Sequence, residues 1–229
     1  MTPKEIRRRI SGLISATPGL PPLDQPTINA FYYDGALKAA ELADIEELKA
    51  QDIVSIVASQ VDYLMPADVM EFVDVRFLNQ NSGFYERLHN VELSALSEYR
   101  GDVLVYARAG VYRTAGADRG KKILRLSLTP SAAITNGLVV TYQRKPQRLE
   151  DVGDDNEIID LPERIQSLIP YYAAFQWFSN QGAKPIKDIG AQYYQYFKDE
   201  CAEFHRKRGD QHQRDVRREI STDWGGLTL

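Results

Sequence analysis

The sequence predicts an α+β fold: an α-helical bundle with an inserted β-rich lobe and an extended C-terminal tail. Apolar residues recur at helical spacing in the first 50 residues and again after residue 160, whereas short β-branched runs separated by turn residues fill the region between them. Because helices both precede and follow the strands, we expect the helices to pack together and the strands to form an insertion. The predicted segments are 1–50 for the N-terminal helices, 51–145 for the β-rich lobe, 146–204 for a linker and the closing helix pair, and 205–229 for the tail.

Two helices are expected at the N-terminus. Thr2 and Glu5 have the spacing of a capping box, and an apolar stripe follows them, which predicts a helix over residues 3–16. A stretch with three prolines in five residues ends this helix. A second helical region over 24–49 contains Gly35, which indicates either a kink or a point of close packing.

The hydrophobic period changes after Gln51, where β-branched runs alternate with turn signals. Residues 91–99 are expected to form a short helical turn, and Asn136-Gly137 is expected to separate two strands. We predict about six strands in this lobe. Their approximate ranges are 69–78, 84–89, 103–107, 111–114, 123–128 and 138–143, and a short β-branched run at 53–57 precedes them.

The closing helix pair is rich in aromatic residues. Apolar residues recur at i, i+3, i+4 and i+7 from Ile165, and Asn180-Gln181-Gly182 interrupts them, which predicts two helices joined by a short turn. The aromatic side chains indicate a packing surface, either inside the domain or between subunits. Its members are Tyr171, Tyr172, Trp177, Tyr193, Tyr194 and Tyr196.

Composition narrows the possible function. The chain has 229 residues and a net charge of −4, which favours neither general nucleic-acid binding nor attraction to a membrane surface. No apolar run approaches the roughly 20 residues of a membrane span, and no signal peptide is expected. The one cysteine, Cys201, cannot form an internal disulfide, which suits a reducing compartment.

No catalytic, metal or cofactor site is predicted. Cys201 and His205 are four residues apart on a predicted helix, but two ligands do not make a metal site, so we expect a buried cysteine beside a solvated histidine. The acidic residues of 151–157 do not follow the calcium-loop register and indicate a solvated linker. An enzyme assembled from scattered residues remains an alternative. Such a site would draw on Asp68, His89, Arg108 and Asp118.

The C-terminal tail is locally basic. From Arg206 to Glu219 it has six Lys/Arg against three Asp/Glu, and it has no apolar stripe that could bury it. One interpretation is an exposed, solvated end. A second is a docking arm that becomes ordered on an acidic partner, with two apolar anchors near its end. A third is DNA binding, although no recognition helix precedes the tail. The residues of this arm would be Arg206, Lys207, Arg208, Arg214, Arg217, Arg218, Trp224 and Leu227.

The order of three motifs resembles the head-to-tail adaptor (connector or head-completion) proteins of tailed bacteriophages. The segment 61–69, which contains Tyr63, Pro66 and Asp68, is similar to the family's extended segment before a first long strand. The segments 126–130 and 138–146 are similar to the strand pair that ends the lobe, and 161–197 to the closing helix pair. The resemblance covers roughly residues 25–200. Met65 stands where Leu is more usual, and the tail is longer and more charged.

The resemblance implies a non-enzymatic virion protein without cofactors, assembled in the host cytoplasm. It implies a ring of about twelve copies beneath the portal that extends the DNA channel. The implied partners are other copies, the portal protein, a downstream tail or head-completion protein, and DNA that passes without sequence-specific binding; no membrane is implied. The tail would insert between portal subunits, and the β-rich lobe would face a neighbouring subunit or the tail. The alternative is a helical protein–protein interaction module that forms no ring.

Overall fold

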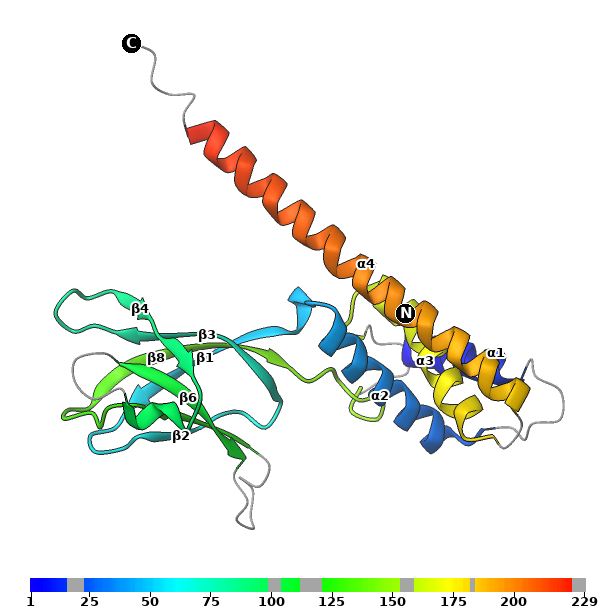
Figure 1. The fold of residues 1–229 in the computed structure, drawn as a ribbon, viewed down its shortest axis with the longest axis horizontal. Coiled ribbons are helices and arrows are strands. Elements are labelled where there is room, and N and C mark those ends of the chain that lie inside the picture. Colours follow the sequence, from blue (N-terminus) through cyan, green and yellow to red (C-terminus); the bar gives the residue numbers. More distant parts are fainter. Residues whose placement is uncertain (16–22, 99–103, 112–120, 153–158, 182–183, 224–229) are drawn as a thin grey trace. The chain divides into compact units, whose positions relative to one another are not determined.

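A computed structural model describes residues 1–15, 23–98, 104–111, 121–152, 159–181 and 184–223. It confirms the α+β class and divides the chain into two compact units (Figure 1). The helical unit comprises Met1–Leu48 and Pro146–Leu229, and the β lobe comprises Lys49–Lys145.

The helical unit is built around α3. Its elements are α1 (Pro3–Ser15), α2 (Gln25–Leu42), the 3-10 turn η1 (Glu46–Leu48), α3 (Glu163–Ser179) and α4 (Lys184–Asp223). Helix α3 contacts each of the other three α-helices. Local capping sets the first two helix starts, because Glu5 and Thr2 exchange the two hydrogen bonds of a capping box and Asp24 accepts from the backbone N–H of Thr27.

Gly35 is a point of close packing. A Cβ atom at this position of α2 would lie 3.1 Å from Cγ2 of Ile169 and 3.2 Å from Cδ1 of Tyr172. Both neighbours belong to α3, and Ile169 is fully buried. The missing side chain therefore allows α2 and α3 to approach closely, so close packing is the correct alternative of the two that the sequence left open.

Two helix boundaries differ from the prediction. Helix α2 ends at Leu42, not near residue 49, because Ala43 takes an extended conformation (φ −121°, ψ 130°). Helix α4 continues to Asp223, so the prediction of an extended conformation from residue 205 is wrong as far as this residue (Figure 1). The segment has no apolar stripe, but Arg, Lys, Gln and Glu are good helix formers, and they sustain the helix without one.

The described residues of the β lobe form two four-stranded sheets. The first has the order β1-β8-β3-β4 and is antiparallel throughout. The second has the order β2-β7-β6-β5, in which β5 and β6 are parallel. The strands are β1 (Lys49–Ile56), β2 (Asp62–Leu64), β3 (Val69–Leu78), β4 (Tyr85–Arg87), β5 (His89–Val91), β6 (Val105–Val111), β7 (Lys122–Leu126) and β8 (Ile134–Arg144), with the 3-10 turn η2 (Ala95–Glu98) between β5 and β6.

An apolar cluster lies inside the lobe, with Val75, Leu124, Leu138 and Val140 completely buried. Leu96, Val105 and Ala107 form a second, smaller cluster among the described residues of the lobe. The range predicted as one strand over 84–89 is divided between β4 and β5, which belong to different sheets. Most of the strand predicted over 111–114 lies outside the described residues.

Asn136-Gly137 does not separate two strands, as the sequence predicted, but lies inside β8. The register between β1 and β8 shifts here, from Val54 opposite Leu138 to Ile56 opposite Ile134. Asn136 has a φ of 55°, and a Cβ at Gly137 would lie 2.8 Å from Cδ1 of Ile56. The dipeptide that often makes a hairpin turn therefore forms an irregularity within a continuous strand.

Candidate interaction surfaces

The predicted aromatic surface lies mainly between α3 and α4, where we call it the aromatic seam (Tyr171, Tyr172, Phe175, Phe178, Tyr193, Tyr194, Tyr196 and Phe197). Ring centroids lie 4.8 Å apart for Tyr171 and Tyr196, and 4.5 Å apart for Phe175 and Tyr194. Tyr172 contacts the completely buried Phe197 at 5.1 Å. Such tilted and stacked pairs stabilise the contact beyond the burial of their area.

The seam leaves one edge open to solvent. Tyr196 is 45% exposed and lies on the same helix as Ile189, which is 40% exposed. Burial raises the pKa of Tyr172, so its hydroxyl stays protonated at neutral pH. The seam therefore serves first as packing within the unit, and Tyr196 is its most exposed ring.

Trp177 lies on another part of α3. Its ring meets Phe31 of α2 edge to face at 6.5 Å, and the side chain is half-buried. Its indole Nε1 is buried and has no hydrogen-bond partner among the described residues. Trp177 thus packs α3 against α2.

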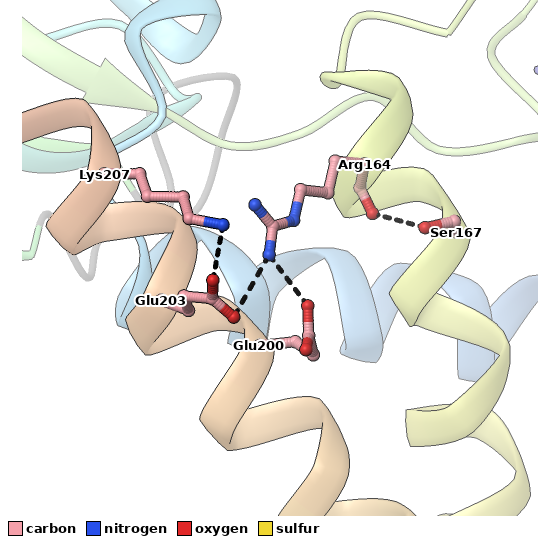
Figure 2. Close-up of polar contacts among 5 residues, drawn as sticks. All are labelled: Arg164, Ser167, Glu200, Glu203 and Lys207. Carbon is pink, nitrogen blue, oxygen red and sulfur yellow. Dashed lines mark hydrogen bonds and ion pairs between the residues drawn. The ribbon is translucent and has the colours of Figure 1, made fainter. Parts of the chain in front are cut away.

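A polar cluster joins α3 to α4 beyond the seam (Figure 2). The Arg164 guanidinium lies 2.9 Å from the Glu200 carboxylate and 3.4 Å from that of Glu203, and Lys207 lies 2.5 Å from Glu203. Ser167 donates to the backbone carbonyl of Arg164 at 2.6 Å. The hydrogen bond from Lys207 lowers the pKa of Glu203, so this carboxylate is ionised at neutral pH.

A second set of contacts, which we call the α4 clamp, lies one turn further along α4. The Arg208 guanidinium donates two hydrogen bonds to the Glu47 carboxylate, at 3.0 and 3.1 Å, and lies over the ring of Phe204. His205 Nδ1 accepts from the backbone N–H of Asp44 at 3.3 Å. The clamp therefore fastens α4 to the segment after α2, at the point where α4 begins to run past the other helices (Figure 1).

The predicted docking residues divide into three groups. Lys207 and Arg208 form ion pairs within their own unit, whereas Arg206 is exposed. Arg214, Arg217 and Arg218 belong to the distal part of α4, where only the helix itself is described. Trp224 and Leu227 lie outside the described residues. No sequence signal could have assigned Arg208 to Glu47, since the pair is 161 residues apart.

The family-like motif organises the β lobe. Tyr63 is 2% exposed, and its hydroxyl donates to the Gln60 carbonyl at 2.9 Å. The Pro66 carbonyl accepts from the Val69 N–H at 3.3 Å, and the Asp68 carbonyl accepts from the Lys145 N–H at 2.6 Å. The motif thus forms the turn that leads into β3, and its contacts are structural ones.

In the described part of the chain, no hydrogen bond or ion pair joins Asp68, His89 and Arg108 to one another. Arg108 pairs with Glu71 at 2.9 Å and stacks on Phe72, while Asp118 lies outside the described residues. Cys201 is completely buried, and burial raises the pKa of its thiol to about 12. The described residues contain no group of three His, Cys, Asp or Glu side chains that could hold a metal ion. Among them, no helix is both long enough and apolar enough to cross a membrane.

A family model described as "SU10 adaptor protein" matches residues 1–219, which include the whole β lobe and the helical unit as far as residue 219. No curated protein matches the chain.

Proposed function

The chain belongs to the SU10 adaptor protein family, and from this membership we propose that it is a virion structural protein that joins the head of a tailed bacteriophage to its tail. The match supports this role because it extends over the helical unit and the β lobe together. The function would be mechanical and non-enzymatic, and the protein would assemble in the host cytoplasm and remain in the virion neck.

In this proposal about twelve copies form a ring beneath the portal. A closed ring requires two different contact surfaces on each copy, since every subunit meets one neighbour on each side. The exposed edge of the aromatic seam and the β lobe are chemically different surfaces on one chain, and this supports the arrangement. The ring would extend the DNA channel and present a surface to the next tail or head-completion protein.

The distal part of α4 is the proposed docking arm, and its length is the observation that carries this assignment. Between Arg208 and Asp223 the helix rises by about 22 Å, at about 1.5 Å per residue. This part carries Arg214, Arg217 and Arg218. A basic helix beyond the bundle suits insertion between portal subunits, where acidic groups would pair with it and where Trp224 and Leu227 would anchor the end.

Charge also fits a conduit for DNA. The chain carries a net charge of −4. A strongly basic lumen would bind the phosphate backbone and release counterions, which would slow the passage of DNA. The proposed contact with the genome is therefore transient and independent of sequence.

The proposal is tested by the mass of the purified protein, alone and mixed with portal particles, measured by light scattering or native mass spectrometry. We expect the portal particle to gain the mass of a ring of about twelve subunits. A protein that leaves the portal mass unchanged would contradict the adaptor role and favour a helical interaction module without ring assembly.

A further inference from the structure

We propose that neighbouring copies in the ring join their β lobes edge to edge, with β1 of one copy pairing antiparallel to β4 of the next. This inference rests on the proposed ring and identifies one of its subunit contacts. The partner is a second copy of this chain, and the contact is a continuous sheet made by backbone hydrogen bonds across subunits.

Strand β1 is an edge strand with little of the usual protection. It pairs with β8 on one side and with no other strand in the described part of the chain. Natural proteins guard such edges with lysine, proline or a short strand, because an open row of N–H and C=O groups recruits other chains. The eight residues of β1 contain no proline, and their one lysine, Lys49, is at the start. Ile53 is 55% exposed, and Val57, just after the strand, is 49% exposed.

The opposite edge of the same sheet carries apolar groups as well. Strand β4 forms this edge, and it follows a turn in which Gly83 has a φ of 74°. Phe84 is 74% exposed, the largest value among the exposed hydrophobic side chains of the described residues, and Tyr85 is 40% exposed. Both edges of this sheet therefore have unpaired backbone groups and exposed apolar side chains.

The strand directions permit a closed head-to-tail arrangement. Each neighbouring pair in the order β1-β8-β3-β4 is antiparallel, so β1 and β4 run in opposite directions. When identical sheets are placed side by side with the same orientation, β4 of one copy therefore meets β1 of the next as an antiparallel pair, the more stable kind of pairing. The two surfaces are different, as a cyclic assembly requires.

Two of these apolar side chains, Ile53 and Tyr85, also share a face. Ile53 is opposite Val139, Val139 is opposite Arg76, and Arg76 is opposite Arg87, so the four side chains form one row across the sheet. Tyr85 is two residues from Arg87 and points to the same face. Across the subunit boundary, Ile53 and Tyr85 would thus lie on one continuous surface.

Charge selects the register. With Tyr85 opposite Gln51, Arg87 would face Lys49, and with Tyr85 opposite Ile53, Glu86 would face Asp52; like charges directly opposite each other destabilise a sheet. With Tyr85 opposite Ser55, no like charges meet. Arg87 then lies opposite Ile53, which its aliphatic stem can cover. Tyr85 would lie diagonally between Ile53 and Val57, within reach of both.

Cysteine cross-linking tests the contact. The double variant Ile53→Cys/Arg87→Cys places thiols on directly opposite residues of adjacent copies. Within one chain these positions are three strand spacings apart, about 14 Å, too far for an internal disulfide. The natural Cys201 is completely buried, so it does not compete. On mild oxidation of the portal-bound protein, we expect a ladder of covalent multimers on a non-reducing gel.

The controls separate the possible failures. Each single variant should remain monomeric on the gel. A dimer of the Ile53→Cys variant alone would mean that two β1 strands pair with each other, and this would overturn the proposal. Light scattering on the same samples reports assembly independently. A ring-sized gain in portal mass without a ladder would refute edge pairing and leave the adaptor role intact, whereas no gain in mass would overturn both.

Hydrogen exchange of the unmodified protein provides a measurement that needs no variant. Amides of β1 and β4 should exchange at least about tenfold more slowly in the ring than in the free chain, because they become paired. Unchanged exchange at both strands in a formed ring would also refute the pairing.

Discussion

Arg208 of α4 places both terminal nitrogens of its guanidinium group on the carboxylate of Glu47, at 3.0 and 3.1 Å, although the two residues are 161 positions apart in the sequence. This bidentate contact is the last described side-chain contact between α4 and the rest of the helical unit. It fixes the place from which the proposed docking arm departs.

Glu47→Gln should weaken the α4 clamp with little effect on global stability. The Arg208 and Glu47 side chains are 34% and 44% exposed, so we expect a loss of at most about 1 kcal/mol in the free energy of unfolding. Hydrogen exchange in residues 200–208 should rise more clearly, because the helix loses its local attachment. Glu41→Gln, which removes the exposed pair with Lys38, is the matched control. A loss above about 3 kcal/mol would indicate a buried charge pair instead.

Deletion of residues 209–229 should separate folding from docking. The shortened chain keeps the α4 clamp and all the described side-chain contacts of α4, so its thermal unfolding should change little. Binding to portal particles, followed by light scattering, should become weaker because the proposed arm is missing. Undiminished binding of the truncated protein would show that the arm does not mediate docking.

Trp177→Ala should destabilise the helical unit less than Phe178→Ala. Phe178 is 1% exposed, and its truncation should lower the free energy of unfolding by about 3–5 kcal/mol. Trp177 is half-buried, so the loss for Trp177→Ala should be near or below the lower end of this range. Denaturant unfolding measures both values. Trp177→Phe keeps an aromatic ring against Phe31 and removes an indole N–H without a described partner, so it should cost much less. A loss below about 1 kcal/mol for Trp177→Ala would place this side chain outside the core.

Gly12 and Gly35 should respond to alanine with opposite signs. At Gly12 of α1 a Cβ meets nothing within 4 Å, so Gly12→Ala should raise the free energy of unfolding by about 0.5–1 kcal/mol through helix propensity. At Gly35 the new methyl group would press on Ile169 and Tyr172. Gly35→Ala should therefore lower the free energy of unfolding by about 1 kcal/mol or more. Chemical denaturation of both variants compares them directly; equal stabilisation would mean that α2 and α3 can move apart freely.

Gly137→Ala should destabilise the β lobe by about 1–3 kcal/mol, because its Cβ would collide with the completely buried Ile56. Adding Ile56→Val removes Cδ1, one of the two atoms that lie 2.8 Å from that position, and should restore part of the loss. A double-mutant cycle from thermal unfolding measures the coupling. Additive effects of the two substitutions would contradict this close contact.

Much of the fold could be predicted because local patterns determine it. The apolar spacing from Ile165, with Pro162 before it and Asn180 after it, marks α3 closely, and the helix extends over Glu163–Ser179. The capping box at Thr2 and Glu5 forms as predicted. These features depend on residues within one or two turns of each other, so a single sequence contains the needed information.

The wrong predictions arose where one local sequence pattern is compatible with two different structures. The absence of an apolar stripe after Phe204 indicated an extended tail, but helix propensity alone continues α4 to Asp223. Asn136-Gly137 indicated a turn between two strands, but the positive φ of Asn136 belongs to an irregularity inside β8. The contacts of the candidate surfaces were not predictable, since pairs such as Arg208 with Glu47 depend on how distant segments meet.

The continuity of α4 has a mechanical consequence. One uninterrupted helix is held by the aromatic seam at one end and runs about 22 Å beyond Arg208 at the other, so it acts as a rigid lever with its fulcrum at the α4 clamp. A tilt of about 10° at this fulcrum moves the far end by about 4 Å, roughly the rise of three helical residues. Small changes in how α3 and α4 pack would thus be amplified at the tip of α4, in the proposed docking arm.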